Sequence, residues 1–247
     1  MGPNTNDETL MRKLVQNGMD IARFNFSHGS HEEQKGRMDM LKKIREEEKK
    51  PVAILLDTKG PEIRTGVLKD GKKVLLKEGE TITLTNEEIE GDETKVSLTY
   101  KGLVDDVQIG NMILIDDGLV GLEVVEIKPV AKPVNTKVNA RDIVCKVLND
   151  GVISNKKGVN VPNVDLTMPF ISEKDYGDIC FAVENDYDFI AASFVRTAED
   201  VMEIRKILAE KGGEDIKIIS KIENMQGVRN IDDIIRVSDG IMVARGD

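Results

Sequence analysis

Residue types that could perform chemistry gather where the apolar runs of this sequence end. The set comprises two carboxylates and three cations: Glu223, Asp247, Arg23, Lys221 and Arg245. A charged side chain within an apolar run is costly unless it is paired or bound to an ion. Two carboxylates beside several cations are what a site needs to hold a divalent metal together with an anionic substrate. The sequence therefore predicts a site for metal-assisted chemistry on an anion.

A structural interpretation competes with this one at each residue. Arg23 or Arg245 could serve only as an ion-pair partner of Asp57 or Asp247, and for any single residue the two interpretations weigh about equally. Polar residues end all five apolar runs, however: Arg23, Asn25 and Ser27; Asp57, Thr58 and Lys59; Ser193 and Arg196; Lys221, Glu223 and Asn224; Arg245 and Asp247. Their recurrence favours a functional site.

Other reactive residue types give weaker signals. The two histidines, His28 and His31, have no second ligand at metal spacing, and His31 is expected to open a helix. Cys145 and Cys180 form no metal-binding spacing and are expected to be buried and unreactive. The segment Gly66–Lys73 nearly matches a phosphate-binding loop but has Lys where Ser or Thr must bind magnesium, so we reject that motif.

The apolar runs alternate with amphipathic helical patterns. The runs are nearly continuous in apolar residues: Asp20–Phe26, Val52–Asp57, Asp188–Val195, Ile216–Glu223 and Gly240–Asp247. This pattern is typical of parallel strands buried on both faces. Such strands, alternating with helices, predict an α/β fold with a parallel sheet.

Helix start signals separate these runs. A hydroxyl residue is followed three positions later by a carboxylate in three places, which predicts helices that begin after Ser30, Ser172 and Thr197. In the helix after Thr197, the apolar stripe is Val201, Ile204 and Leu208. A further helix is expected after Asn224, with Val228, Ile231 and Ile235 on its buried face.

Residues 61–158 differ from both flanks. Short β-rich runs alternate there with Gly and Asp turns, and Lys69–Lys72 and Asp116–Gly118 are hairpin signals. The expected domains are an α/β domain formed by residues 1–60 and 159–247, with an all-β domain inserted at 61–158. The residues outside the insert suffice for about five βα units of a (β/α)8 barrel. An open doubly wound sheet of five strands is the alternative.

Composition narrows the class of protein. With 35 basic and 45 acidic residues, the formal net charge is −10, which disfavours a nucleic-acid partner. No apolar run reaches the roughly 18–20 residues that span a bilayer, and the N-terminus carries no secretion signal. Two cysteines without a disulfide pattern fit a reduced compartment. We expect a cytoplasmic protein without a membrane partner.

Six segments together resemble the pyruvate kinase family, in family order and at family spacing: Ala22–Gly29, Leu55–Gly66, Lys156–Pro162, Asp188–Arg196, Ile218–Asn224 and Asp239–Asp247. The resemblance covers essentially the whole chain and implies an incomplete (β/α)8 barrel with the insert as lid. It also implies that the family's first barrel strand, last barrel strands and C-terminal domain are absent. A segment with Val-Asn-Val-Pro-Asn at 159–163 departs mildly from the family pattern.

The resemblance implies a role for individual residues. Glu223 and Asp247 would bind Mg²⁺ or Mn²⁺, Lys221 would stabilise the phosphoryl group in transit, and Arg23 would bind the phosphate of phosphoenolpyruvate. The backbone at Gly246 would approach the substrate carboxylate. A potassium site would be formed by Asn25, Ser27, Asp57 and Thr58. Contacts with the nucleotide phosphates would come from Arg64, Lys157 and His28.

The activity so implied is phosphoryl transfer from phosphoenolpyruvate to ADP, giving pyruvate and ATP in the final step of glycolysis. Positioning and charge neutralisation would supply most of the rate. Two alternatives remain: a metal-dependent lyase or aldolase acting on pyruvate-type substrates, and a non-catalytic fragment of the same fold. The full-length protein is expected to be a homotetramer.

Overall fold

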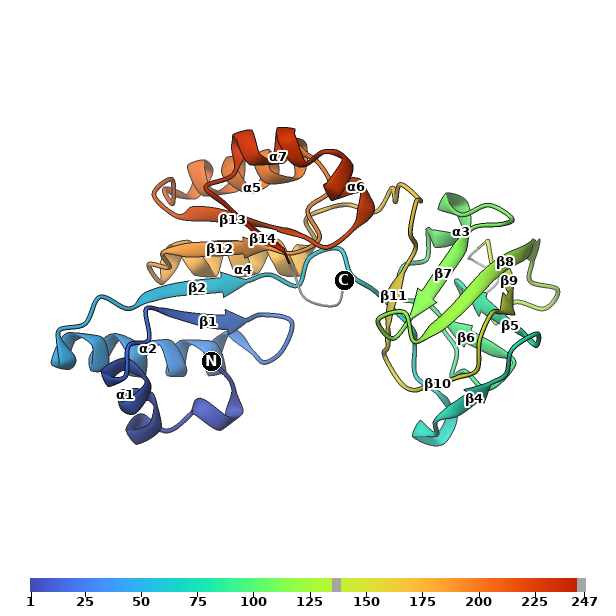
Figure 1. Ribbon diagram of the computed structural model, residues 1–247, viewed down its shortest axis with the longest axis horizontal. Coiled ribbons are helices and arrows are strands. Elements are labelled where there is room, and N and C mark those ends of the chain that lie inside the picture. The colour runs from blue at the N-terminus through green and yellow to red at the C-terminus, as the bar shows by residue number, and fades with distance from the viewer. Residues whose placement is uncertain (135–138, 244–247) are drawn as a thin grey trace. The chain divides into compact units, whose positions relative to one another are not determined.

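The computed structural model describes residues 1–134 and 139–243, which form two compact units (Figure 1). The described residues of the first unit are 1–61 and 169–243, and those of the second are 62–134 and 139–168. Each unit has its own hydrophobic core. Three residues assigned a role above, Arg245, Gly246 and Asp247, lie outside the described residues.

The first unit is built on a five-stranded parallel sheet. Its strands lie side by side in chain order: β1 (Ile21–Asn25), β2 (Ala53–Asp57), β12 (Phe189–Ala192), β13 (Lys217–Ile222) and β14 (Gly240–Val243). A doubly wound sheet reverses its strand order at a switch point. The sheet described here has no reversal, so the doubly wound alternative is wrong and the order fits an incomplete barrel.

Helices pack along this sheet (Figure 1). They are α1 (Glu8–Gln16), α2 (His31–Glu48), α4 (Glu173–Glu184), α5 (Ala198–Lys211), α6 (Met225–Arg229) and α7 (Ile231–Val237), with a 3₁₀ turn at Pro3–Thr5. The predicted start signals are confirmed, because the side chains of Ser30, Ser172 and Thr197 cap α2, α4 and α5. The predicted stripe of α5 is also confirmed, since Val201, Ile204 and Leu208 are buried.

The expectation that the strands are buried on both faces is wrong for β1. Its side chains alternate, so that Ala22 and Phe24 are buried in the core of the first unit while Ile21 and Arg23 are exposed. Successive side chains of a strand point to opposite faces of the sheet. The core of the first unit therefore lies on one face of β1, and Arg23 lies on the other.

The prediction of one helix after Asn224, with Val228, Ile231 and Ile235 on its buried face, is also wrong. Two short helices, α6 and α7, replace it and meet at Asn230. Val228 and Ile235 are 49% and 52% exposed, and the buried residue of α7 is Ile234. A break of this kind resets the helical phase, so a stripe counted across it selects the wrong residues.

The second unit is mainly β-structure. A seven-stranded sheet runs in the order β3 (Ile63–Arg64), β11 (Gly158–Asn160), β7 (Met112–Ile115), β8 (Val120–Pro129), β9 (Arg141–Val147), β5 (Thr81–Thr85) and β6 (Lys95–Ser97). A separate pair joins β4 (Val74–Leu76) to β10 (Gly151–Ile153). The described helical segments are a 3₁₀ turn at Lys69–Gly71 and the one-turn helix α3 (Leu103–Asp106).

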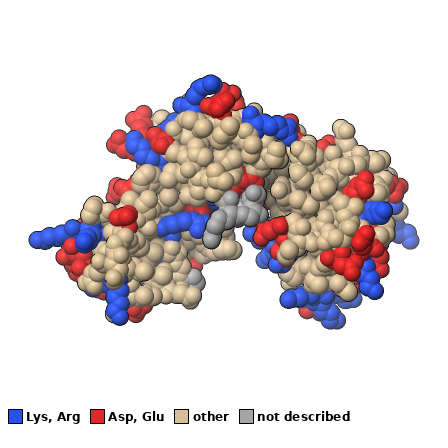
Figure 2. Space-filling view, viewed as in Figure 1, with Lys and Arg blue, Asp and Glu red and all other residues tan. Residues whose placement is uncertain are grey.

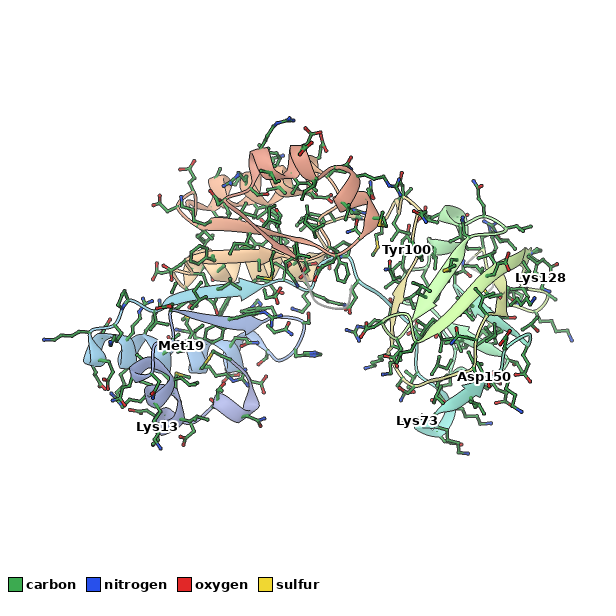
Figure 3. The ribbon with its side chains drawn as sticks, in the orientation of Figure 1. Lys13, Met19, Lys73, Tyr100, Lys128 and Asp150 are labelled. Atoms are coloured by element: carbon green, nitrogen blue, oxygen red, sulfur yellow. The ribbon has the colours of Figure 1, made fainter. Side chains whose placement is uncertain are left out.

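The hairpin predicted at Lys69–Lys72 is wrong, because a 3₁₀ turn lies there between β3 and β4, which belong to different sheets. Other local features of the second unit agree with the sequence. The turn between β7 and β8 is closed by a hydrogen bond from Leu119 N to Asp116 O, and its two central residues, Asp117 and Gly118, have the positive φ that a tight hairpin turn requires. Lys73, from the rejected phosphate-loop motif, lies on the outside of this unit just before β4 (Figure 3). Burial raises the pKa of Cys145 to about 12, so this thiol is unreactive as expected. Cys180, in the first unit, is only half-buried.

Surface charge is mixed in both units. On the face shown in Figure 2, Lys and Arg side chains are interspersed with Asp and Glu side chains. Within the described residues, no helix has both the length and the apolar character that crossing a membrane requires.

Candidate active site

The site lies where four parallel strands of the first unit end. Asn25 and Asp57 are register partners at the ends of β1 and β2, and Asp57 is in turn level with Ala191 of β12. Ser193 follows β12 directly, and Glu223 follows β13 directly. Because parallel strands end at the same edge of a sheet, residues distant in sequence meet here, as the sequence predicts for both barrel and open α/β folds.

Asp57 is the centre of a buried charge cluster. Its Oδ2 accepts a hydrogen bond of 2.6 Å from Arg23 Nε, and its Oδ1 lies 3.2 Å from Lys221 Nζ. Asp57 is 1% exposed and Lys221 is 8% exposed, whereas the side chain of Arg23 is 54% exposed. The structural interpretation of Arg23 as a partner of Asp57 is therefore correct. This ion pair does not exclude a binding role for Arg23, because a guanidinium carries five N–H donors and the Arg23 side chain remains partly accessible to solvent.

Lys221 is surrounded by oxygen atoms. Its ammonium donates to Ser193 Oγ at 3.0 Å and forms an ion pair with Glu223 Oε1 at 3.0 Å, in addition to the contact with Asp57. Buried charges are tolerated when they are paired and hydrogen-bonded. Two carboxylates, Asp57 and Glu223, thus face two cations, Lys221 and Arg23, and their formal charges balance.

Glu223 is oriented from its other side by backbone. Its Oε2 accepts a hydrogen bond of 2.8 Å from the Phe194 amide. Phe194 has a φ of 56°, which is strained for a bulky residue and marks a backbone held in place by its surroundings. The strained turn after β12 therefore aims an N–H group at the Glu223 carboxylate.

Neutral oxygen atoms lie around Asp57. Thr58 Oγ1 accepts from the Ser193 amide at 3.0 Å, and Thr58 O accepts from Ser193 Oγ at 2.6 Å. On the β1 side, Asn25 Oδ1 accepts from the Ser27 amide at 2.9 Å. A carboxylate with amide, hydroxyl and carbonyl oxygens fits a large monovalent cation in donor chemistry.

Glu223 fits a hard divalent ion as a carboxylate ligand, but its expected co-ligand, Asp247, lies outside the described residues. Across residues 1–134 and 139–243, no group of three His, Cys, Asp or Glu side chains is placed to hold a metal ion by itself.

The residues expected near the nucleotide divide between the units. In the second unit Arg64 ends β3 and Lys157 directly precedes β11, the neighbouring strand, and Thr65 N donates to Lys157 O at 2.8 Å. Both are ion-paired, Arg64 with Glu62 and Lys157 with Asp116 at 2.9 Å. The hydrogen bond with Glu62 raises the pKa of Arg64 further. His28 is an exposed residue of the first unit, whereas Arg64 and Lys157 lie together in the second.

Sequence reasoning gave no role to Ser193. It named Ser193 among the polar strand-end residues but did not foresee that its hydroxyl lies between Asp57 and Lys221. One sequence signal was available: Ser193 follows a buried strand that lies between the strands of Asp57 and Lys221. The hydrogen bond from the Phe194 amide to Glu223 has no signal in the sequence, because it depends on the backbone angle φ of Phe194.

Comparison with known proteins decides the family. A family model described as the pyruvate kinase barrel domain matches residues 1–247. The chain belongs to the pyruvate kinase family. It is 50% identical over 247 residues to pyruvate kinase of Clostridium acetobutylicum, covering 100% of this chain and 50% of that protein. It is 48% identical to the Clostridium perfringens pyruvate kinase, with the same coverage, and 49% identical to that of Staphylococcus aureus strain MRSA252, covering 40% of it.

Pyruvate kinase membership confirms the resemblance and the barrel interpretation of the parallel sheet. The chain spans about half the length of the curated pyruvate kinases that it matches. The lid role of the second unit, the domain boundaries and the role of each site residue remain predictions.

Proposed function

We propose that the site transfers the phosphoryl group of phosphoenolpyruvate to ADP, giving pyruvate and ATP in the final step of glycolysis. The observation that carries this proposal is the buried Lys221 ammonium, held between Asp57, Ser193 and Glu223 at the strand ends. Phosphoryl transfer needs concentrated positive charge in a fixed position more than it needs covalent chemistry. The compact ammonium of Lys221, held in place by its hydrogen bonds and ion pairs, meets that need.

Two residues of the first unit would act on the substrate. Arg23 would bind the phosphate of phosphoenolpyruvate with the part of its guanidinium that Asp57 leaves accessible. Lys221 would stabilise the phosphoryl oxygens during transfer. Gly246 and Asp247 are proposed, from the family resemblance alone, to lie against the substrate.

Two metal ions belong to the proposal. Glu223, together with Asp247, would hold Mg²⁺ or Mn²⁺. The cation set (Asn25, Ser27, Asp57 and Thr58) would hold K⁺. When bound, these ions would neutralise negative charge on the substrate oxygens. The oxygen donors and the single carboxylate of the cation set support the assignment of a monovalent ion.

The second substrate would be bound through its phosphates. We propose that Arg64, Lys157 and His28 contact the phosphates of ADP, and that the second unit acts as a lid. A cytoplasmic location and a homotetrameric full-length protein complete the proposal. They rest on the family, whose curated members here are bacterial pyruvate kinases.

Binding of phosphoenolpyruvate tests the proposal. In the presence of Mg²⁺ and K⁺, the Arg23→Met variant should bind phosphoenolpyruvate about thirtyfold more weakly than the wild type, because one charged partner of the phosphate is lost, at a cost of about 2 kcal/mol. Isothermal titration calorimetry measures both affinities. Arg236→Met, at an exposed arginine of the same unit, is the matched control and should bind like the wild type. Absence of phosphoenolpyruvate binding by the folded wild type would contradict the proposal.

A further inference from the structure

Helix α4 contacts the loop that follows β1. Lys174, in its first turn, donates a hydrogen bond of 2.7 Å from Nζ to the carbonyl oxygen of Phe26. Phe26 lies between Asn25 and Ser27, two residues of the cation set. The side chain of Lys174 is 44% exposed, so this amine spans from solvent to the backbone of the loop.

A buried carboxylate on the next turn of α4 fixes this arrangement. Asp178 is 0% exposed, and its Oδ2 accepts a hydrogen bond of 2.6 Å from Lys174 Nζ. Its Oδ1 lies 2.6 Å from Nε2 of His31, the first residue of α2. The imidazole also packs on the Phe181 ring of α4, with 4.6 Å between centroids. Both ends of the segment from Phe26 to His31 are thus tied to α4.

The same turns of α4 hold the loop that follows β2. Asp175 is 1% exposed, and its Oδ1 accepts a hydrogen bond of 3.0 Å from the Gly60 amide. Its Oδ2 lies 2.5 Å from Ser172 Oγ, the helix cap. Gly60 is two residues beyond Thr58, another member of the cation set. One rigid helix therefore contacts both loops that supply the set.

From these contacts we infer that Lys174, with Asp175 and Asp178, positions the cation set and thereby sets the affinity for the monovalent ion. The inference rests on the proposed function, which assigns K⁺ to that set. A large, weakly hydrated cation is bound well only when several neutral oxygens are held at the right spacing before it arrives. The three α4 residues are positioning residues, because their hydrogen bonds go to Phe26, Gly60 and His31, which lie in the loops beside the cation set.

Direct measurement of K⁺ binding tests the inference without relying on turnover. The melting temperature is followed as KCl replaces tetramethylammonium chloride at constant ionic strength, and the rise gives a Kd for K⁺. Lys174→Met should raise that Kd about fivefold, the effect of losing one hydrogen bond of ordinary strength. The melting temperature without K⁺ should also fall, because Lys174→Met leaves the buried Asp178 carboxylate with one partner fewer, so each Kd is taken from that variant's own KCl dependence. Lys174→Arg, which can still donate to Phe26 O, should recover most of the affinity.

Lys35→Met is the matched control. Lys35 forms an i, i+4 ion pair with Asp39 on α2, as Lys174 does with Asp178 on α4, and it is 50% exposed. Its Kd for K⁺ should equal that of the wild type. An unchanged Kd in Lys174→Met, beside a wild type that binds K⁺, would overturn the inference and leave the proposed function standing. A wild type that K⁺ does not stabilise would contradict the cation site and the inference together.

A measurement on the wild type covers the case in which a variant does not fold. Hydrogen exchange is compared in K⁺ and in tetramethylammonium. If α4 positions the set, K⁺ should slow exchange in residues 25–31, in residues 57–60 and in the first two turns of α4 together. Slower exchange in the two loops with no change in α4 would overturn the inference.

Discussion

At the scale of single residues, the site combines charges that would each be costly alone. Asp57 and Glu223 are buried carboxylates, and the Lys221 ammonium lies within hydrogen-bond distance of both. Each charge offsets the desolvation of its neighbours. The arrangement also keeps the lysine side chain in one place, which is the property that an electrostatic catalyst requires.

Glu223 gives the sharpest prediction at this scale. Glu223→Gln removes the anionic oxygen proposed to bind the divalent metal, and Mn²⁺ affinity measured by electron paramagnetic resonance should fall about tenfold or more. Glu203→Gln changes an exposed carboxylate of α5 in the same unit and should leave the affinity unchanged. Equal Mn²⁺ affinities in wild type and Glu223→Gln would remove Glu223 from the metal site.

Several residues of the site could be predicted from the sequence, because the ends of the apolar strands can be located in it. Asp57 ends its apolar run, and Arg23 and Lys221 lie within two residues of the ends of their strands, which predicts that they meet. The hydroxyl of Ser193 and the amide of Phe194 could not be assigned, because their contacts depend on one turn geometry after β12. Such contacts are set by tertiary packing, which no local pattern encodes.

At the scale of elements, the loop after β2 depends on a close backbone approach. Gly60 has a φ of +68°, and a Cβ at this position would lie 2.6 Å from the carbonyl oxygen of Ser193. Only glycine fits at this position, and the Gly60 amide donates the hydrogen bond that Asp175 accepts. The loop that carries Thr58 is thereby held against the strand end that carries Ser193.

Gly60→Ala should lower the free energy of unfolding by about 2 kcal/mol or more, because the added methyl group must displace backbone. Gly18→Ala is the matched control: its φ is +95°, but nothing lies within 4 Å of the added Cβ. It should cost only the conformational term, about 1 kcal/mol. Urea denaturation measures both. A Gly60→Ala variant no less stable than Gly18→Ala would show that the approach to Ser193 does not constrain this loop.

Elements were predictable to the extent that their signals are local. The caps at Ser30 and Thr197 lie within four residues of sequence, and the structure shows both capping boxes. The break at Asn230 was missed, because its side chain bonds the Arg196 carbonyl, 34 residues away. Exposure of one face of β1 was likewise invisible, since an apolar run does not tell which face a helix covers.

At the scale of the whole molecule, two separate cores imply separate cooperative units. The core of the first unit includes Ile204 and that of the second includes Ile113, and both side chains are fully buried. Chains with more than one core commonly depart from two-state unfolding. The calorimetric enthalpy of unfolding should therefore exceed the van 't Hoff enthalpy.

Core substitutions assign the two transitions. Ile113→Ala and Ile204→Ala each leave a cavity that costs about 2–5 kcal/mol. Ile113→Ala should lower the melting temperature of one calorimetric transition, and Ile204→Ala that of the other. A single transition lowered equally by both variants would contradict the picture of two units that unfold separately.

The central claim is that the cluster around Lys221 performs phosphoryl transfer. Its most direct test is pyruvate formation from phosphoenolpyruvate and ADP, with Mg²⁺ and K⁺, by the wild-type chain and by Lys221→Met, each shown to be folded and to bind Mn²⁺. The account predicts turnover by the wild type and loss of at least about a thousandfold in kcat for the variant, because one electrostatic stabiliser of the transition state is removed. Pyruvate formation by Lys221→Met at the wild-type rate would contradict the claim.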